Sequence, residues 1–363
     1  MALIDRLSRW VRRHPVVETK GTAPDARQRG PVDLIVILDG TMSTLEAGQE
    51  TNAGQVFRLL SDEGPGPGRR LYYEPGLQWE GLRRWVDVAI GRGINRQIRR
   101  AYGWLANRYR PGDRIFLFGY SRGAYAVRSL AGVIDRVGLL RHDQATERNV
   151  LMAYRHYQLA PNSHAARAFS YELCHLECEI QMVGVWDTVK ALGFRIPGLW
   201  LWTEKAHAFH NHHLGPSIRH GFHALAHDET RVMFEPVLWE CPEGWEGNVE
   251  QVWFRGAHAD VGGQIGACAA ARPLSNIPLV WMLERAEACG LPLPAGWRAQ
   301  FPCDPDAPMV GTWRSWGKMF LMRRRRRVGG DRSEKLHPSV QQHIPMTEAV
   351  TSALRSGLSR RSV

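Results

Sequence analysis

The sequence predicts an α/β protein with a mostly parallel central sheet flanked by helices. Three apolar runs, at residues 34–38, 114–118 and 180–186, have the length and composition of buried strands. Segments compatible with helices lie between them, and a chain of 363 residues is long enough for a large core. In such sheets, functional groups gather at the carboxyl ends of the strands.

In the first part of the chain, the strand at 34–38 is continuous and apolar and ends at Asp39. Residues 43–61 are compatible with a helix, and residues 72–76 with a short strand and turn. A helical pattern covers about residues 82–109 and leads to the second strand.

The second part repeats this alternation. Residues 143–160 are helical in pattern, and the strand at 180–186 ends at Asp187. Residues 188–250 are rich in Trp, Pro and His, and we expect them to form an irregular lid or cap. A strand at 249–254 and a helix at 278–290 complete the predicted elements.

The net charge of +11 belongs to the two ends of the chain. Residues 1–30 hold 7 basic and 3 acidic side chains, and residues 313–363 hold 12 and 3. Residues 31–312 hold 28 and 30, which argues against a nucleic-acid-binding groove there. We therefore divide the chain into three parts. They are a basic N-terminal segment and linker (1–31), a main domain (32–300) and an Arg-rich C-terminal extension (301–363).

A G-x-S-x-G motif stands between the second strand and a helical pattern. Ser121 is its serine, and Gly119 and Gly123 leave room for a sharp strand-to-helix turn. A strand, this motif and a helix together are typical of the nucleophile elbow of an α/β-hydrolase. The sequence thus predicts an exposed nucleophilic hydroxyl at the start of a helix.

A serine nucleophile needs a base and an acid that orients the base. In this fold they follow the serine in the order acid, then histidine, each at the end of a strand. Asp187 and His258 are the candidates in the correct order. Asp260 is a rival for the acid, although we expect it to hold the adjacent glycine turn.

The oxyanion hole is expected to combine two sets of backbone amides. One is the N–H of Arg122, and the other comes from the loop Gly40-Thr41-Met42 after the first strand. Asp39 is expected to hold that loop as a structural acceptor.

Six motifs in order resemble one family, the α/β-hydrolase domain of Tle-type lipase effectors of bacterial type VI secretion and their uncharacterised relatives. They are Leu38-Asp39-Gly40-Thr41, Tyr73-Glu74-Pro75-Gly76, Arg110-Pro111-Gly112-Asp113, Phe118-Gly119-Tyr120-Ser121-Arg122-Gly123-Ala124-Tyr125, Val183-Gly184-Val185-Trp186-Asp187-Thr188-Val189 and Gly256-Ala257-His258-Ala259-Asp260-Val261-Gly262-Gly263. The similarity runs from about residue 32 to 291, and the family triad falls on Ser121, Asp187 and His258. Met42 stands where the family usually has an aromatic residue, and Gln264 where a third glycine often follows.

The resemblance implies an enzyme that cleaves carboxylic esters without a cofactor, and the acyl esters of phospholipids are its expected substrates. A carboxylesterase for small molecules is one alternative. A catalytically silent scaffold that binds membrane or nucleic acid through its basic tails is another. The large accessory region of the effectors is absent, so the resemblance does not imply a secreted toxin, and a housekeeping esterase is equally compatible.

Two basic segments are candidates for contact with an anionic membrane. Residues 1–13 fit a short amphipathic helix, and residues 319–327 contain Arg323 to Arg327; solvated segments are the alternative for both. We expect a cytoplasmic or peripheral membrane protein with no signal peptide or transmembrane segment, and specialised export stays open. The sequence does not predict the oligomeric state.

The His-rich segment 207–227 lacks a recognisable ligand pattern, so we expect a polar lid there and no metal.

Overall fold

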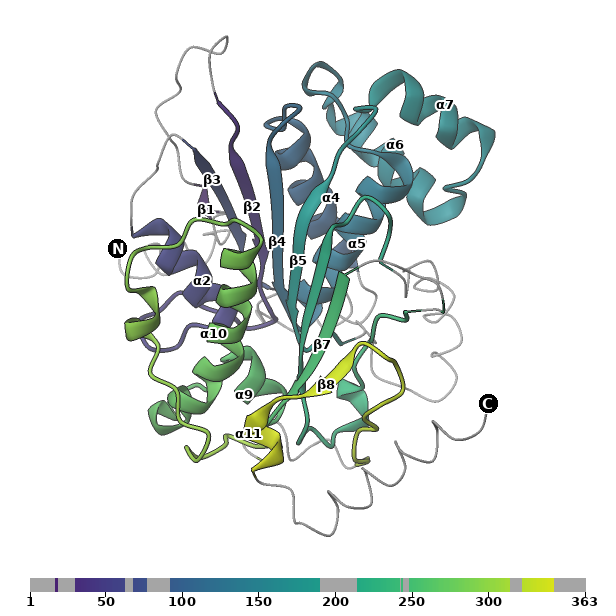
Figure 1. The fold of residues 1–363 in the computed structure, drawn as a ribbon. Helices are drawn as coiled ribbons and strands as arrows, with labels where there is room; N and C mark the ends of the chain where they lie inside the picture. Colours follow the sequence, from purple (N-terminus) through teal and green to yellow (C-terminus); the bar gives the residue numbers. More distant parts are fainter. Residues whose placement is uncertain are drawn as a thin grey trace, which may run out of the picture.

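The computed structural model describes residues 17–18, 30–62, 68–76, 92–189, 214–241, 243, 248–313 and 322–342. Within this part, a sheet of eight strands forms the centre of the molecule, in the order β1-β3-β2-β4-β5-β6-β7-β8 (Figure 1). The strands are parallel to their neighbours, except for β1, which is antiparallel to β3. The predicted α/β architecture with a mostly parallel sheet is therefore confirmed.

The bounds of the elements follow the chain. The strands are β1 (Val17–Glu18), β2 (Asp33–Leu38), β3 (Arg69–Glu74), β4 (Arg114–Tyr120), β5 (Ile180–Trp186), β6 (His220–Ala226), β7 (Asn248–Phe254) and β8 (Glu334–Leu336). The α-helices are α2 (Asn52–Ser61), α4 (Arg92–Ala106), α5 (Arg122–Val137), α6 (Glu147–Leu159), α7 (His164–Leu173), α9 (His258–Gly262), α10 (Arg272–Ala288) and α11 (Pro338–Gln341).

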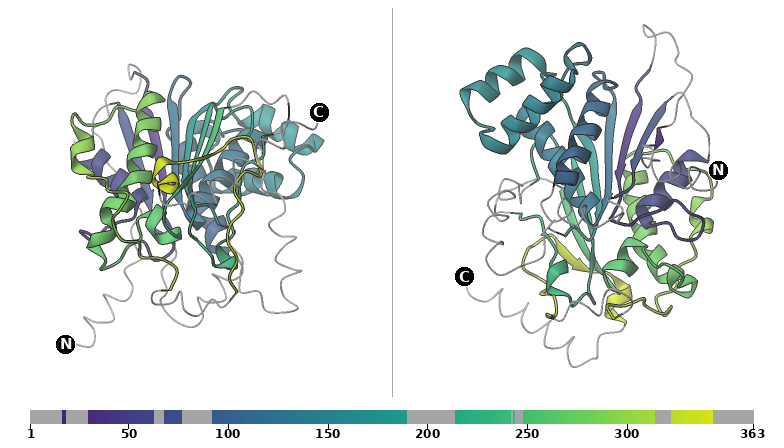
Figure 2. Two further views of the ribbon diagram at one scale, coloured as in Figure 1. Left: turned by 60° about the horizontal axis from the view of Figure 1, so that its bottom comes forward. Right: turned by 180° about the vertical axis from the view of Figure 1, so that it is seen from behind.

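The central strands are largely apolar because both faces of the sheet are covered. In β2, Leu34 and Val36 pack into one core, while Ile35 and Ile37 pack into the other. Helices α4, α5 and α6 supply side chains to the first core, and α2, α9 and α10 supply the second. Figure 2 shows the two helical layers on opposite sides of the sheet. Strands buried in this way lose the alternation of polar and apolar residues.

Most of the predicted elements are present, with shifted ends. The strand predicted at 180–186 has those bounds, and the helix predicted at 43–61 begins only at Asn52, where Thr51 caps it. The helix predicted at 278–290 begins earlier, at Arg272, and contains Pro278. Of the helix predicted at 82–109, residues 92–106 are helical, and residues 82–91 lie outside the described part.

The expectation of an irregular lid over 188–250 is wrong for its middle, which forms a strand of the sheet. β6 lies between β5 and β7 and pairs with both in parallel. His223 lies on this strand, fully buried, and its ring is satisfied by Gln251 Oε1 (3.3 Å) and by the amide of Thr188 (3.1 Å). A hydrogen-bonded histidine is therefore part of the sheet core here.

The C-terminal boundary predicted at residue 300 is also corrected. Phe301 and Ala307 lie in the second core, with side chains of α2, α9 and α10, and β8 adds a parallel strand to β7. Trp253 on β7 donates its indole N–H to Glu334 on β8 over 2.7 Å. At least residues 301–313 and 322–342 are thus integral to the domain.

Several predictions fall on residues outside the described part. They include the basic helix at 1–13, residues 190–213 of the proposed lid with His207, His210, His212 and His213, and residues 319–321 of the basic run. Among the described residues, no helix combines the length and hydropathy needed to cross a membrane.

Candidate active site

The nucleophile candidate lies on a strained turn between β4 and α5. Ser121 has φ 57° and ψ −118°, a backbone conformation that costs free energy and persists only where the surroundings hold it. Its amide donates to the carbonyl of Trp186 over 3.0 Å. A Cβ on Gly119 would lie 2.7 Å from the Cα of Ala124, and one on Gly123 would collide with the carbonyl of Leu38. The two glycines are therefore needed for the turn to pack.

The acid candidate lies at the end of β5, fully buried. Asp187 has φ 41°, and its amide donates to the carbonyl of Ala224 over 2.7 Å. Burial would raise the pKa of this carboxyl group. The charge of Arg326 and the hydrogen bond from His258 outweigh burial and hold the pKa well below its usual range. Asp187 is therefore an anion at neutral pH.

The base candidate is the first residue of α9, just after β7. His258 Nδ1 lies 2.5 Å from Asp187 Oδ2, and its Nε2 lies 2.9 Å from Ser121 Oγ. The imidazole packs between the rings of Tyr120 (5.0 Å between centroids) and Phe234 (4.8 Å). The structure thus brings the three predicted residues together, with the histidine between the serine and the carboxylate.

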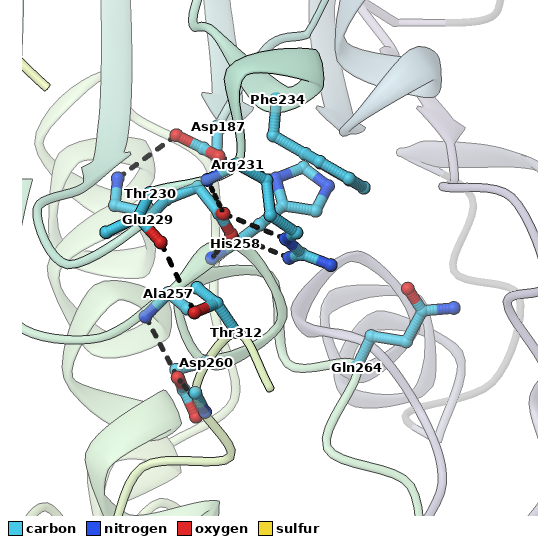
Figure 3. A network of polar contacts seen from close by, with 12 residues as sticks. Asp187, Glu229, Thr230, Arg231, Phe234, Ala257, His258, Asp260, Gln264 and Thr312 are labelled. Atoms are coloured by element: carbon cyan, nitrogen blue, oxygen red, sulfur yellow. Dashed lines mark hydrogen bonds and ion pairs between the residues drawn. The ribbon is translucent and has the colours of Figure 1, made fainter. Parts of the chain in front are cut away.

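The loop after β6 supports this histidine, and the sequence analysis did not single it out. Glu229 accepts the backbone N–H of His258 over 3.2 Å and pairs with Arg231 over 2.6 Å. The guanidinium of Arg231 lies 3.9 Å from the centre of the Phe234 ring. Figure 3 shows that Glu229, Arg231 and Phe234 surround the imidazole. A sequence signal for this loop is the run Ala226-His227-Asp228-Glu229-Thr230-Arg231, in which two acidic residues stand just before an arginine.

Asp260 has a structural role, as expected, but its carboxylate binds three other amides and not the glycine turn that follows it. Its carboxylate accepts the amides of Ala257 (2.9 Å), Val310 (2.6 Å) and Gly311 (3.2 Å), and it lies apart from the imidazole in Figure 3. Burial raises the pKa of this group, against the effect of these three amides. Asp260 therefore joins the start of α9 to the chain around residue 310.

Asp39 holds the loop after β2, also as expected. It accepts from the amide of Gly40 (2.6 Å) and from the hydroxyls of Thr51 (2.7 Å) and Tyr73 (2.7 Å). Burial raises its pKa to about 6, although these hydrogen bonds oppose the shift. The Gly40 amide is thus already a donor to Asp39. This corrects the prediction that it serves the oxyanion, and the Thr41 and Met42 amides stay as candidates beside Arg122.

Gln264 ties that loop to the region after α9. Its amide nitrogen donates to the carbonyl of Thr41 over 2.9 Å, and its Oε1 lies 3.5 Å from the hydroxyl of Tyr120. Tyr120 also packs against His258. The Tyr120 side chain therefore contacts both the imidazole and Gln264, which binds the loop after β2.

Two of the five consecutive arginines point inward. Arg326 donates to both carboxylate oxygens of Asp187, over 2.5 and 3.0 Å, and its side chain is only 5% exposed. Arg323 contacts Thr230 and lies over the ring of Trp313. The run therefore does not face a membrane as a whole, whereas Arg324, Arg325 and Arg327 are exposed.

Among the described residues, no group of three His, Cys, Asp or Glu side chains is placed to hold a metal ion. His223 is buried in β6, and His227 pairs with Asp228 over 3.0 Å.

These elements define an α/β protein in which serine, histidine and aspartate meet at the carboxyl ends of parallel strands. The chain belongs to the family described as T6SS, phospholipase effector Tle1-like, catalytic domain, whose model matches residues 33–285. The predicted family is therefore confirmed.

The individual proteins that the chain resembles share less than 30% sequence identity with it. The chain is 28% identical over 240 residues to the uncharacterized protein YEL023C of Saccharomyces cerevisiae. This match covers 59% of this chain and 33% of the yeast protein. It resembles the crystal structure of an uncharacterized protein from Pseudomonas aeruginosa with a TM-score of 0.45 and 16% identity, covering 77% of this chain and 50% of the other. For the Tle1 effector bound to the VgrG spike of the type 6 secretion system, the TM-score is 0.36 and the identity 17%, covering 70% and 58%. The chain thus spans one third to three fifths of these relatives.

Proposed function

We propose that this protein is a serine hydrolase of carboxylic esters with the α/β-hydrolase fold, and that its substrates are phospholipids or similar lipids. One observation carries the proposal: His258 lies within hydrogen-bond distance of both Ser121 Oγ and the Asp187 carboxylate. Membership of a phospholipase effector family supports the substrate class.

In the proposed reaction, Ser121 Oγ attacks the carbonyl carbon of the ester while His258 Nε2 takes the hydroxyl proton. The ester C–O bond breaks, and the alcohol leaves with that proton. Water then gives a proton to His258 and attacks the acyl carbon. The bond between the acyl group and Ser121 Oγ breaks, the proton passes from His258 to Oγ, and the fatty acid is released. Asp187 holds the imidazole in the tautomer that accepts at Nε2.

Negative charge develops on the ester oxygen in both steps. The amide of Arg122 lies at the start of α5, where helix N–H groups have no partner within the helix. The second donor would come from the Thr41–Met42 loop, which Asp39 and Gln264 hold in place. Loss of one such donor typically lowers kcat about 10²- to 10³-fold.

Apolar side chains at the surface favour a lipid over a polar ester. Met42, on the proposed oxyanion loop, is 49% exposed. Trp313 and Met322 are 60% and 66% exposed, and both adjoin segments that contact the loop after β6. Exposed apolar groups beside a site are typical of proteins that take substrate from a lipid surface.

The test is labelling of the purified protein with a fluorescent fluorophosphonate, followed by assays with phospholipid vesicles and a short-chain ester. Ser121→Ala should lose both labelling and turnover. Ser129→Ala is the matched control, since it removes a second hydroxyl from α5 that donates to the Tyr125 carbonyl, and it should label like the wild type. Absence of labelling in folded wild-type protein would contradict the proposal and favour a silent scaffold. Turnover of the short ester alone would favour a carboxylesterase.

A further inference from the structure

The C-terminal strap, residues 322–336, reaches into the site from beyond the region that the family model covers. It begins beside the loop after β6, where the amide of Val232 donates to Met322 and the amide of Arg324 donates to Thr230. It ends in β8, which pairs with β7. Arg326 lies between these two attachments. Since both ends are fixed by backbone hydrogen bonds, the position of its side chain is defined by the fold.

Arg326 and Asp187 are joined by two hydrogen bonds, one to each carboxylate oxygen. Asp187 Oδ1 accepts from Arg326 Nη1 (2.5 Å) and from the amide of Ala226 (3.0 Å). Its Oδ2 accepts from Arg326 Nη2 (3.0 Å) and lies 2.5 Å from His258 Nδ1. The guanidinium also donates to the carbonyls of Ala226 and Phe234. A carboxylate held by two parallel N–H donors cannot rotate about its Cβ–Cγ bond without breaking them.

We infer that Arg326 is a positioning residue of the proposed hydrolase, which fixes the Asp187 carboxylate against His258 and balances its charge. This inference rests on the function proposed above. Arg326 does not touch the substrate in this role. Its effect passes through Asp187, whose orientation decides whether His258 Nε2 faces Ser121.

The charge of Arg326 gives the inference a signature in pH. The elements packed against His258 carry these charged or titratable side chains: Tyr120 at the end of β4, Asp187 after β5, Asp228, Glu229 and Arg231 after β6, Asp260 further along α9, and Arg326 on the C-terminal strap. Glu229 is paired with Arg231, and Asp260 is held by three amides. Arg326 is therefore the cation that opposes an imidazolium through its contact with Asp187.

The experiment measures kcat and KM for a soluble short-chain ester from pH 5 to 9 in the wild type, Arg326→Met and Arg326→Lys. In Arg326→Met we expect kcat to fall roughly 10²-fold, because the carboxylate is no longer fixed. The acid limb of the kcat/KM profile should move up by roughly one pH unit, because no guanidinium opposes the imidazolium. In Arg326→Lys the charge stays, so the limb should stay while kcat falls.

Arg324→Met is the matched control. It removes an arginine of the same run whose side chain is exposed and pairs with Glu235 at the surface, and it should keep the wild-type rate. Fluorophosphonate labelling and the melting temperature of each variant are measured in parallel.

Wild-type kcat and pH profile in Arg326→Met would overturn the inference. A lower kcat and melting temperature with an unmoved acid limb would also overturn it, because a purely structural role gives that pattern. If Arg326→Met does not fold, Arg326→Lys decides, and wild-type kcat there would overturn the positioning role. An unlabelled and inactive wild type would contradict the proposed function and this inference with it. If the wild type is labelled and active, the Arg326 variants test the inference alone.

Discussion

Replacing Asp39 by asparagine is expected to remove a pH-dependent cost of folding. The side chain is fully buried, and its pKa is raised from 3.8 to about 6, chiefly by burial. The folded state therefore binds the proton more tightly than the unfolded state does. Stability from this group is complete below pH 3.8 and is lost as the pH rises through 6. A shift of this size corresponds to about 3 kcal/mol, of which roughly half falls between pH 5 and pH 8.

The assay is urea unfolding of the wild type and Asp39→Asn at pH 5 and pH 8. Asparagine keeps an oxygen for the amide of Gly40, and the hydroxyls of Thr51 and Tyr73 can turn to suit its NH₂ group. Between pH 5 and pH 8, the free energy of unfolding of the wild type should fall by about 1 kcal/mol more than that of the variant. Equal changes in the two proteins would refute the reasoning, since Asp39 would then be ionised to the same extent when folded and unfolded.

Two further predictions concern packing and the buried histidine. Gly123→Ala puts a methyl group against the carbonyl of Leu38 and should cost about 3 kcal/mol or more, seen as a lower urea midpoint or loss of folded protein. Gly103→Ala, in α4, meets only Val150 at 3.6 Å and should instead stabilise by about 0.5–1 kcal/mol; a loss equal to that of Gly123→Ala would contradict the steric argument. Burial lowers the pKa of His223 to about 3. The contribution of this group to the stability of the folded protein is therefore complete above pH 6.5 and is lost as the pH falls from 6.5 towards 3. Between pH 7 and pH 5, the free energy of unfolding of His223→Gln should therefore fall by about 2 kcal/mol less than that of the wild type. Equal losses in urea unfolding would contradict this, since His223 would then be protonated to the same extent in the folded and unfolded states.

The sequence predicted the parts of the fold that depend on local pattern. β5 is apolar except for Gln181 and is followed by an aspartate, and both features could be recognised without knowing its neighbours. The turn at Ser121 follows from glycines that leave space for the backbone, which is also a local requirement. The spacing and order of Asp187 and His258 then sufficed to select two residues that the structure places beside Ser121.

β6 was missed because its pattern is misleading. His220, Gly221 and His223 interrupt an otherwise apolar run, and histidine in a His-rich stretch indicates a polar loop. The structure satisfies His223 with Gln251 from the neighbouring strand, a partner 28 residues away. Such a pairing depends on strand order, which local composition does not contain.

Arg326 was missed for a related reason. Five consecutive arginines have no periodicity, so nothing in the run distinguishes the one that is buried. Its partner, Asp187, lies 139 residues earlier in the chain. Arg326 and Asp187 come within hydrogen-bond distance because the chain returns to the sheet, where β8 pairs with β7.

The late position of β8 also sets the order in which the site is completed during synthesis. Ser121, Asp187 and His258 are all made before residue 326, and domains begin to fold from the N-terminal side as the chain emerges. The parallel pairing of β7 and β8 closes a loop of about 80 residues, a slow step compared with local helix formation. A nascent chain therefore contains Ser121, the proposed nucleophile, before it contains Arg326, the proposed positioning residue of Asp187. If the role of Arg326 holds, full activity is withheld until the strap has been translated and docked.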